Sequence, residues 1–417
     1  MLNLSILTIG DEICIGQIIN TNAAWIAKKC SQIGYKVICH SSVRDDMDLM
    51  LSELDRLTKM SDIIIVTGGL GPTHDDITKP TLAKFFNDII EHNEEAMEYV
   101  NRFFEVRERE VSERNRMQAE IPIKAIPLEN KNGTAPGMRF DENGIHLFSL
   151  PGVPSEMKQL MSDFVIPFLK EKLLNTKESV EVYKTILTTG IPESHLADII
   201  GEPDSFMNDG TLAFLPSYQG VRLRIGVCLD NIQKAHSMLE KLERHLYKKA
   251  GEFIFGENED TLASVVGNIL ISKGETVSVA ESCTSGMLGA AFTDFPGSSA
   301  FFEGGMMVYS NEAKMNMLGV NKKTLQDHGA VSEETALEMA NNIRQKLGTT
   351  YGIGITGIAG PTGGTADKPV GTVWISLAYR EGAIAQRYVF GSDREVNRER
   401  SVGTALAMLY KHLKGIR

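Results

Sequence analysis

The sequence has few of the features that mark disulfide-rich, zinc-finger, membrane or secreted proteins. Its 417 residues include five cysteines, an odd number with no C-x-x-C pair, so neither a disulfide framework nor a cysteine zinc site is predicted. No apolar run reaches the roughly 20 residues that a membrane-spanning helix needs, so no membrane partner is expected. The first residues lack a basic stretch before an apolar core, which predicts no secretory signal and a cytoplasmic location.

Positive charge is also scarce. Lysine and arginine total 43 against 54 acidic residues, which gives a net charge of −11. An acidic surface argues against nucleic acid as a partner, although it permits a local pocket for a small anion. Hydrophobic residues make up 42% and charged residues 23%, as in ordinary globular proteins. The length favours two or three domains.

A buried strand followed by a glycine-rich loop organises the first half of the chain. The continuous apolar run Ile63–Thr67 predicts a strand covered on both faces. Three glycines follow at once: Gly68, Gly69 and Gly71. Lacking Cβ atoms, they let backbone N–H groups turn toward a phosphate, and Asp75 and Asp76 come close enough to hold a metal ion beside it. The alternative is a tight turn with a solvated aspartate pair.

Further strands place other acids near this loop. Strands at 4–9 and 35–41 alternate with helices, one of them capped at Asp45-Asp46, and this order predicts a parallel sheet. Ligands of such sheets bind at the carboxyl ends of the strands, where Asp11 follows the first strand. A strand at 145–150 leads to a helix whose first turn holds Glu156, a second candidate metal ligand. The charged stretch 92–116 predicts a long helix with a solvated face.

Five motifs in the first 170 residues resemble the CinA (competence/damage-inducible) family. They are Gly10-Asp11-Glu12, Asn20-Thr21-Asn22, the loop from Gly68 to Asp76, Gly133 to Gly137, and Pro151 to Met157. The resemblance implies that residues 1–171 form an α/β domain with a parallel sheet, similar to molybdopterin-binding domains. It also implies metal-dependent hydrolysis of ADP-ribose to AMP and ribose 5-phosphate.

The same resemblance carries over two predictions for this first domain: the Gly68–Gly71 loop would bind phosphate, and Asp76 would be catalytic. Asp11, Asp75 and Glu156 are our further candidates, which would hold a divalent metal ion (Mg, Mn or Co) together with Asp76. Such an ion neutralises the pyrophosphate and can produce hydroxide near neutral pH.

Residues 172–254 change in character and predict a small α+β domain. The family has a domain of KH-like topology here. A KH module that binds nucleic acid needs a G-x-x-G loop, and this segment has none. We therefore interpret it as a spacer and dimerisation element, which predicts a homodimer.

In residues 255–417, a serine at a strand-to-helix turn is a candidate nucleophile. Residues 276–280 predict a strand, and Ser282 follows before a helical pattern, where helix N–H groups would hold an oxyanion. The alternative is a serine that caps the helix. Lys314 could activate Ser282 if burial lowers its pKa, and Tyr309 could relay the proton.

These residues, with 296–299 and 328–332, resemble the nicotinamide-nucleotide amidase domain, the C-terminal part of the CinA family. The resemblance implies an α/β domain that converts nicotinamide mononucleotide to nicotinate mononucleotide and ammonia without a cofactor. Ser282 would be the nucleophile, Lys314 its base, and Tyr309 would assist. Cys283 is a rival nucleophile.

The substrate is expected to meet loop residues and arginines of this domain. Thr284 and Gly286 follow the proposed nucleophile, but Ser285 stands where the family commonly has glycine and could crowd the oxyanion loop. A second glycine-rich loop contains Gly357 and Gly360, which would let a nucleotide approach closely. Two arginines near the start of the last helix are candidates for phosphate binding, with surface arginines as the alternative: Arg394 and Arg398.

Together these features predict a bifunctional hydrolase of pyridine-nucleotide recycling. Its partners would be two small anionic nucleotides, nicotinamide mononucleotide and ADP-ribose. The alternatives are a nucleotide- or pterin-binding module without catalysis, or an accessory protein of DNA uptake or repair. The sequence leaves open which metal is used and whether both activities persist.

Overall fold

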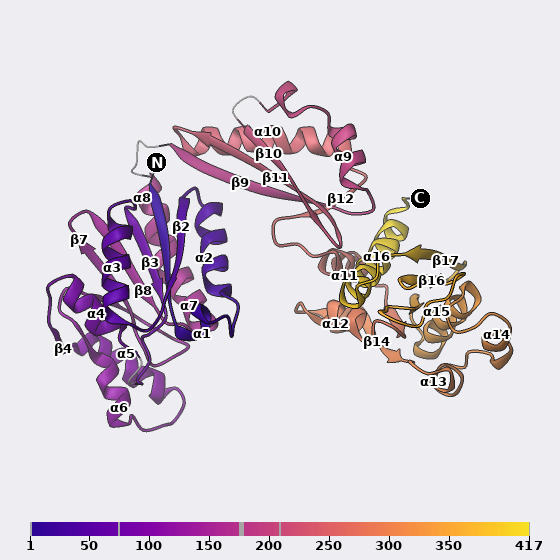
Figure 1. Cartoon of the computed structure of the whole chain (residues 1–417), viewed down its shortest axis with the longest axis horizontal. Coiled ribbons are helices and arrows are strands. Elements are labelled where there is room, and N and C mark those ends of the chain that lie inside the picture. The colour runs from indigo at the N-terminus through magenta and orange to yellow at the C-terminus, as the bar shows by residue number, and fades with distance from the viewer. Residues whose placement is uncertain (1, 74–75, 175–178, 208–209, 417) are drawn as a thin grey trace. The chain divides into compact units, whose positions relative to one another are not determined.

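The computed structural model describes residues 2–73, 76–174, 179–207 and 210–416. Two compact units make up the chain: residues 1–183 with 226–241, and residues 184–225 with 242–417. Figure 1 shows the elements in chain order, and three of its sheets have four or more strands. None of the described helices has the length and apolar character to cross a membrane.

The first large sheet has six strands in the order β2-β1-β3-β8-β7-β6. Three neighbouring pairs, which join β2, β1, β3 and β8, are parallel, and the pairs β8–β7 and β7–β6 are antiparallel. The predicted parallel sheet is thus confirmed for the first four strands. Its strands are β1 (Asn3–Ile9), β2 (Lys36–Val43), β3 (Ile63–Thr67), β6 (Ile126–Leu128), β7 (Gly137–Glu142) and β8 (Ile145–Leu150).

Both faces of this sheet are covered, which explains the unbroken apolar run in β3. Ile63 and Ile65 pack into one core, whereas Ile64 and Val66 pack into the other, because successive strand residues point to opposite faces. The helices of this region are α1 (Asp11–Cys14), α2 (Thr21–Gln32), α3 (Met47–Thr58), α4 (Thr78–Phe85), α5 (Glu94–Glu105), α6 (Glu113–Arg116), α7 (Pro154–Leu160) and α8 (Ile166–Leu174).

The charged stretch 92–116 is not one helix, contrary to prediction. Helix α5 ends at Glu105, and Glu108 has a φ of 53°, in the left-handed region, which an L-residue in a helix does not adopt. The chain resumes helical form only at α6. Two short strands on either side of this stretch, β4 (Ile90–His92) and β5 (Glu120–Pro122), form an antiparallel pair.

The middle segment forms a four-stranded sheet in the order β10-β11-β9-β12. Its α+β character agrees with the sequence prediction, and no G-x-x-G loop occurs in it. Its elements are β9 (Val180–Thr188), α9 (Glu193–Ile200), β10 (Gly210–Ser217), β11 (Gly220–Leu229), α10 (Ile232–Ala250) and β12 (Ile254–Glu257).

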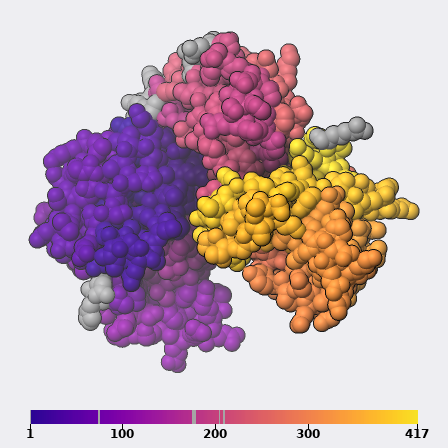
Figure 2. Space-filling model, turned by 45° about the vertical axis from the view of Figure 1, so that its right-hand side comes forward, coloured from indigo at the N-terminus to yellow at the C-terminus, as the bar shows by residue number. Residues whose placement is uncertain are grey.

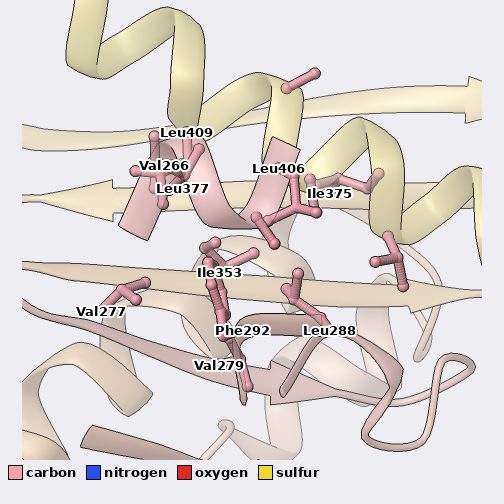
Figure 3. Packing of buried hydrophobic residues seen from close by; sticks show 14 of the residues in the cluster. Val266, Val277, Val279, Leu288, Phe292, Ile353, Ile375, Leu377, Leu406 and Leu409 are labelled. Atoms are coloured by element: carbon pink, nitrogen blue, oxygen red, sulfur yellow. The ribbon is translucent and has the colours of Figure 1, made fainter. Parts of the chain in front are cut away.

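The last sheet has five strands in the order β14-β13-β15-β16-β17, of which the first three are parallel. They are β13 (Val277–Glu281), β14 (Phe302–Met307), β15 (Tyr351–Gly357), β16 (Thr372–Tyr379) and β17 (Gly382–Val389). Side chains from these strands meet those of the covering helices in one apolar core, as Figure 3 shows for Val279, Phe292, Ile353 and Leu406.

Helices cover both faces of this sheet. Helix α15 lies against β15, where a Cβ at Gly352 or Gly354 would collide with backbone atoms of the helix. The residues of this domain, orange to yellow in Figure 2, form one closely packed body. Its helices are α11 (Leu262–Lys273), α12 (Met287–Thr293), α13 (Asn311–Asn316), α14 (Lys322–Asp327), α15 (Glu333–Leu347) and α16 (Arg394–Lys414).

Candidate active sites

A cavity of about 740 Å³ lies where β1, β3 and β8 end. This is the edge at which parallel sheets bind ligands. The structure brings most of the predicted residues of the first domain to it, namely Asp11, Gly68, Gly69, Gly71, Asp76 and Glu156. Glu12, Asp45 and Thr134 also line it.

Glycine is required in the loop after β3 for steric reasons. Gly68 and Gly69 have φ values of 113° and 65°, a region that L side chains rarely adopt. A Cβ at Gly68 would collide with the carbonyl of Ile9, and one at Gly69 with the Thr78 hydroxyl. That hydroxyl donates to the Gly68 carbonyl at 3.0 Å, which ties the loop to the start of α4.

Asp76 closes the loop as well as lining the cavity. Its Oδ2 accepts the Thr73 N–H at 2.8 Å and also the Thr73 hydroxyl. One carboxylate oxygen is therefore already hydrogen-bonded within a local turn, which is part of the alternative that the sequence left open. Asp75 lies outside the described residues, so its role remains a prediction.

Glu156 is half-buried at the cavity, in the first turn of α7 as predicted. Burial raises the pKa of its carboxyl, and the hydrogen bond from Asn130 Nδ2 at 2.6 Å opposes that rise. The same Asn130 amide donates to the Ala135 carbonyl at 2.8 Å. A Cβ at Gly133 would collide with the Glu156 carboxylate, which explains glycine at that position.

Asp45 is an additional acid of this cavity that the sequence analysis treated only as a helix cap. The cap of α3 is Asp46, which accepts N–H groups of the first turn, whereas Asp45 Oδ2 accepts the Asp11 N–H at 3.0 Å. Burial raises the pKa of Asp45, and the nearby carboxylates of Asp11, Glu12 and Asp76 add to the rise. Its position directly after β2, at the same sheet edge, was the available signal.

Oxygen donors of this kind suit a hard divalent cation such as Mg²⁺. Across the described residues, however, no three histidine, cysteine or acidic side chains are close enough together to hold a metal ion. The carboxylates thus surround the cavity without forming a ready-made ligand cluster among the residues described.

The second candidate site joins Ser282 to Lys314. Lys314 Nζ lies 3.0 Å from Ser282 Oγ and donates to the carbonyls of Val308 at 2.9 Å and Tyr309 at 3.0 Å. Lys314 is 1% exposed and Ser282 is 7% exposed. Burial lowers the pKa of Lys314, because desolvation disfavours the charged ammonium. A lysine with a lowered pKa can accept the serine proton.

Cys283 is placed as a packing residue. It is 4% exposed within the apolar core of the last sheet, and burial raises the pKa of its thiol to about 11. The thiol is therefore protonated near neutral pH and is a poor nucleophile. Tyr309 is 66% exposed, and the contact described for it with Lys314 is through its carbonyl, so a role for its hydroxyl remains a prediction.

The loop after Ser282 differs from expectation in two ways. The N–H groups of Gly286, Leu288 and Gly289, which open α12, donate to the Glu281 carboxylate, so they do not face an oxyanion as predicted. The cap position of α12 is Gly286, which rules out Ser282 as the helix cap. Ser285 has a φ of 49°, a left-handed backbone conformation that glycine adopts with less strain than serine.

Arg394 and Arg398 line a separate cavity of about 570 Å³. Arg394 Nη1 donates to the Gly360 carbonyl at 2.9 Å, and Arg398 Nη2 donates to the Thr284 carbonyl at 3.1 Å. Two polar atoms here are buried without a partner among the described residues: Arg398 Nε and Thr284 Oγ1. Gly357 is the last residue of β15, three residues before Gly360 in the sequence. Phosphate binding by the arginines remains a prediction.

Comparison with known proteins accounts for the whole chain. Family models match in three places: the CinA C-terminal domain at 259–413, the "probable molybdopterin binding domain" at 5–171, and the damage-inducible protein CinA KH domain at 183–256. A CinA-like protein of Chloroherpeton thalassium is 41% identical over 413 residues, 97% of each chain. The chain belongs to the CinA family. The CinA-family membership and the fold class predicted from the sequence are thereby confirmed.

The chain is also similar to other proteins. A CinA-like protein of Kosmotoga olearia is 38% identical over 408 residues, covering 98% of both chains. A crystal structure of a competence-damaged protein (CinA) superfamily protein from Klebsiella pneumoniae is 38% identical and covers 37% of this chain and 96% of its own, with a TM-score of 0.36. The competence/damage inducible protein from Agrobacterium tumefaciens is also 38% identical, covering 37% and 97%, with a TM-score of 0.35.

Proposed function

We propose that the C-terminal domain is a serine–lysine amidase that hydrolyses nicotinamide mononucleotide to nicotinate mononucleotide and ammonia. The observation that carries the proposal is the 3.0 Å approach of Lys314 Nζ to Ser282 Oγ in a site that nearly excludes water. The pair supports nucleophilic hydrolysis as the class of reaction, whereas the proposed substrate is taken from the resemblance to the family's amidase domain.

The proposed reaction uses the pair twice. Neutral Lys314 takes the proton from Ser282 as Oγ attacks the carboxamide carbon, and the protonated lysine then gives that proton to the departing NH₂ group. Ammonia leaves, and a water molecule hydrolyses the resulting ester to restore the serine. Burial supports this cycle because it lowers the pKa of Lys314 and so favours the neutral base.

The unpartnered polar atoms near the loop support an anionic, hydrogen-bonding substrate. Arg398 Nε and Thr284 Oγ1 lack partners among the described residues, and buried polar groups without partners are costly. A substrate phosphate or ribose hydroxyl would satisfy them. We also propose phosphate binding by Arg394, because both arginines line the neighbouring cavity.

We further propose that the N-terminal domain hydrolyses ADP-ribose to AMP and ribose 5-phosphate. The specific observation is the cavity that combines the glycine loop with carboxylates after three parallel strands. We propose Asp11, Asp76 and Glu156 as ligands of a divalent metal ion, with Asp75 as the fourth. The three described acids do not form a metal-binding group as they stand, so the ion would have to draw them together. The metal would supply charge neutralisation of the pyrophosphate. The competing proposal is a cavity that binds a nucleotide or pterin without turnover.

Ammonia release from nicotinamide mononucleotide by wild type, Ser282→Ala and Cys283→Ala tests the first proposal. We expect Ser282→Ala to lose at least ~10³-fold in kcat and Cys283→Ala to stay within about twofold, because its protonated thiol only packs. Loss in Cys283→Ala alone would contradict the serine assignment. No release by the folded wild type would remove the amidase function. Sedimentation of the same samples tests the proposed homodimer.

A further inference from the structure

A buried carboxylate without a cation lies next to the proposed nucleophile. Glu281 is the last residue of β13, directly before Ser282, and is 1% exposed. No salt bridge to it is found among the described residues. An isolated buried carboxylate is expensive, so its surroundings must stabilise the charge in another way.

Three backbone N–H groups do so. Glu281 Oε2 accepts from Gly286 N at 3.0 Å and from Leu288 N at 3.2 Å, and Oε1 accepts from Gly289 N at 2.9 Å. Hydrogen bonds to an ionised acceptor are stronger than neutral ones. The carboxylate therefore joins the end of β13 to the first turn of α12 and holds the intervening loop at both ends.

Most of the backbone N–H groups of residues 282–289 already donate hydrogen bonds within the protein. Ser282 N donates to the Ile355 carbonyl and Met287 N to the Thr284 carbonyl, while Glu281 takes three more. The groups of this segment for which the described structure shows no acceptor outside their own residue are those of Cys283, Thr284 and Ser285. Of these three, Thr284 and Ser285 lie nearest in sequence to Gly286, whose N–H is held by Glu281.

We infer that Glu281 is a positioning residue for the Ser282–Lys314 site. It fixes the loop so that Ser282 Oγ stays within reach of Lys314 Nζ, and it keeps the Thr284 and Ser285 N–H groups unpaired for the oxyanion that forms when the substrate carbonyl is attacked. Glu281 does not touch the substrate. This inference rests on the proposed amidase function.

The strained conformation of Ser285 supports the inference. A residue with φ of 49° persists only where its surroundings hold it. The chain on either side of Ser285 is fixed by hydrogen bonds. Before it, Ser282 N donates to the Ile355 carbonyl of β15, and after it, Gly286 N donates to the Glu281 carboxylate. The Ser285 hydroxyl adds only a weak bond, at 3.2 Å, to the Ser282 carbonyl.

The test compares Glu281→Gln and Glu281→Asp in the full chain. Glutamine keeps the size but replaces one acceptor oxygen by an NH₂ group that faces N–H donors. We expect kcat for ammonia release to fall about 10²-fold with KM changed less than about threefold, since oxyanion donors act mainly in the transition state. Glu281→Asp keeps the charge and should recover part of the loss.

Glu303→Gln is the matched control, because Glu303 is exposed on the neighbouring strand β14. It removes the same charge and should leave kcat unchanged. Thermal unfolding identifies any variant that fails to fold, in which case Glu281→Asp carries the comparison. Hydrogen exchange of residues 283–290 gives a readout without substrate, and exchange should be faster in Glu281→Gln.

Wild-type kcat in a Glu281→Gln protein would overturn the inference, as would a kcat loss without faster loop exchange. If the folded wild type releases no ammonia, the proposed function fails, and the positioning role for catalysis fails with it. The exchange comparison still decides separately whether Glu281 holds the loop.

Discussion

The two candidate sites of this chain solve the problem of charge in opposite ways. At the N-terminal cavity, carboxylates from Asp11, Asp45, Asp76 and Glu156 gather, and no lysine or arginine is among the described lining residues. At the C-terminal site, Lys314 is buried, has no carboxylate partner in the described part of the chain, and has a lowered pKa. The first site has an excess of negative charge that a bound cation would offset, and the second discourages charge on its base.

The two sites also differ in how far their side chains are arranged for catalysis before a ligand binds. The Ser282–Lys314 pair is within hydrogen-bonding distance before any ligand arrives. The acids of the N-terminal cavity form no cluster of three among the described residues. We therefore expect the amidase activity to depend on protonation and the hydrolase activity on added metal.

Asp76→Asn should produce the largest separation between the two sites. Loss of a ligand charge should reduce AMP release from ADP-ribose by about 10²-fold or more, while ammonia release stays unchanged. Removal of metal by a chelator should act in the same direction on the same activity. Both are measured on one sample by AMP and ammonia assays.

Thr73→Ala is the control for Asp76→Asn, because it removes a hydrogen bond to Asp76 but keeps the acid. A loss in Thr73→Ala as large as that in Asp76→Asn would mean that Asp76 only shapes the loop. AMP release that resists chelation would contradict the metal, and binding without turnover would favour the pterin- or nucleotide-binding module.

The pH dependence should distinguish the sites by smaller, graded effects. Lys314 must be neutral to act, so kcat/KM for ammonia release should rise about tenfold per pH unit below its pKa and level off above it. Burial lowers that pKa from 10.5, so the midpoint should lie below 10.5. A midpoint at or above pH 10.5 would contradict an activated lysine.

AMP release should depend on pH in a more acidic range. Burial raises the pKa of Asp45 and Glu156 above the usual carboxyl values of 3.8 and 4.5. Their deprotonated forms are lost as pH falls through these raised values, so activity should decline at a higher pH than for ordinary carboxylates. Asp45→Asn should move this acidic limb, and an unmoved limb would exclude Asp45 from the titration.

Ser285→Gly should have the smallest effect. Glycine tolerates a φ of 49° without strain, so the free energy of unfolding should rise by up to about 1 kcal/mol, less the weak bond of the Ser285 hydroxyl. Ammonia release should stay within about threefold or increase. Thermal unfolding measures the first effect. A loss of stability would show that the lost hydroxyl bond and the greater freedom of the unfolded glycine chain together outweigh the backbone strain.

Much of the architecture could be predicted from local patterns. The apolar run in β3 is continuous because both faces are buried, and a pattern of that kind does not depend on distant residues. The stretch 92–116 was mispredicted because its charge pattern is compatible with one continuous helix, and nothing in that pattern marks the left-handed backbone of Glu108.

The sites divide in the same way. Ser282 and Lys314 were proposed from residue types and resemblance, whereas Asp45 and Glu281 were not. Asp45 belongs to the N-terminal cavity only because parallel strands end at one edge. Glu281 was hidden because its three partners are backbone N–H groups, and a sequence does not show which side chain a backbone group meets.

The sequence by itself determined the family, the α/β class and the residue types of both sites, because these depend on composition, periodicity and motif order. Only the tertiary structure decided which groups are charged and which are engaged. Burial lowers the pKa of Lys314 and raises that of Cys283, and burial is a property of packing. The helix N–H groups predicted to hold an oxyanion instead bind Glu281, because hydrogen-bond partners are chosen by distance in the folded chain.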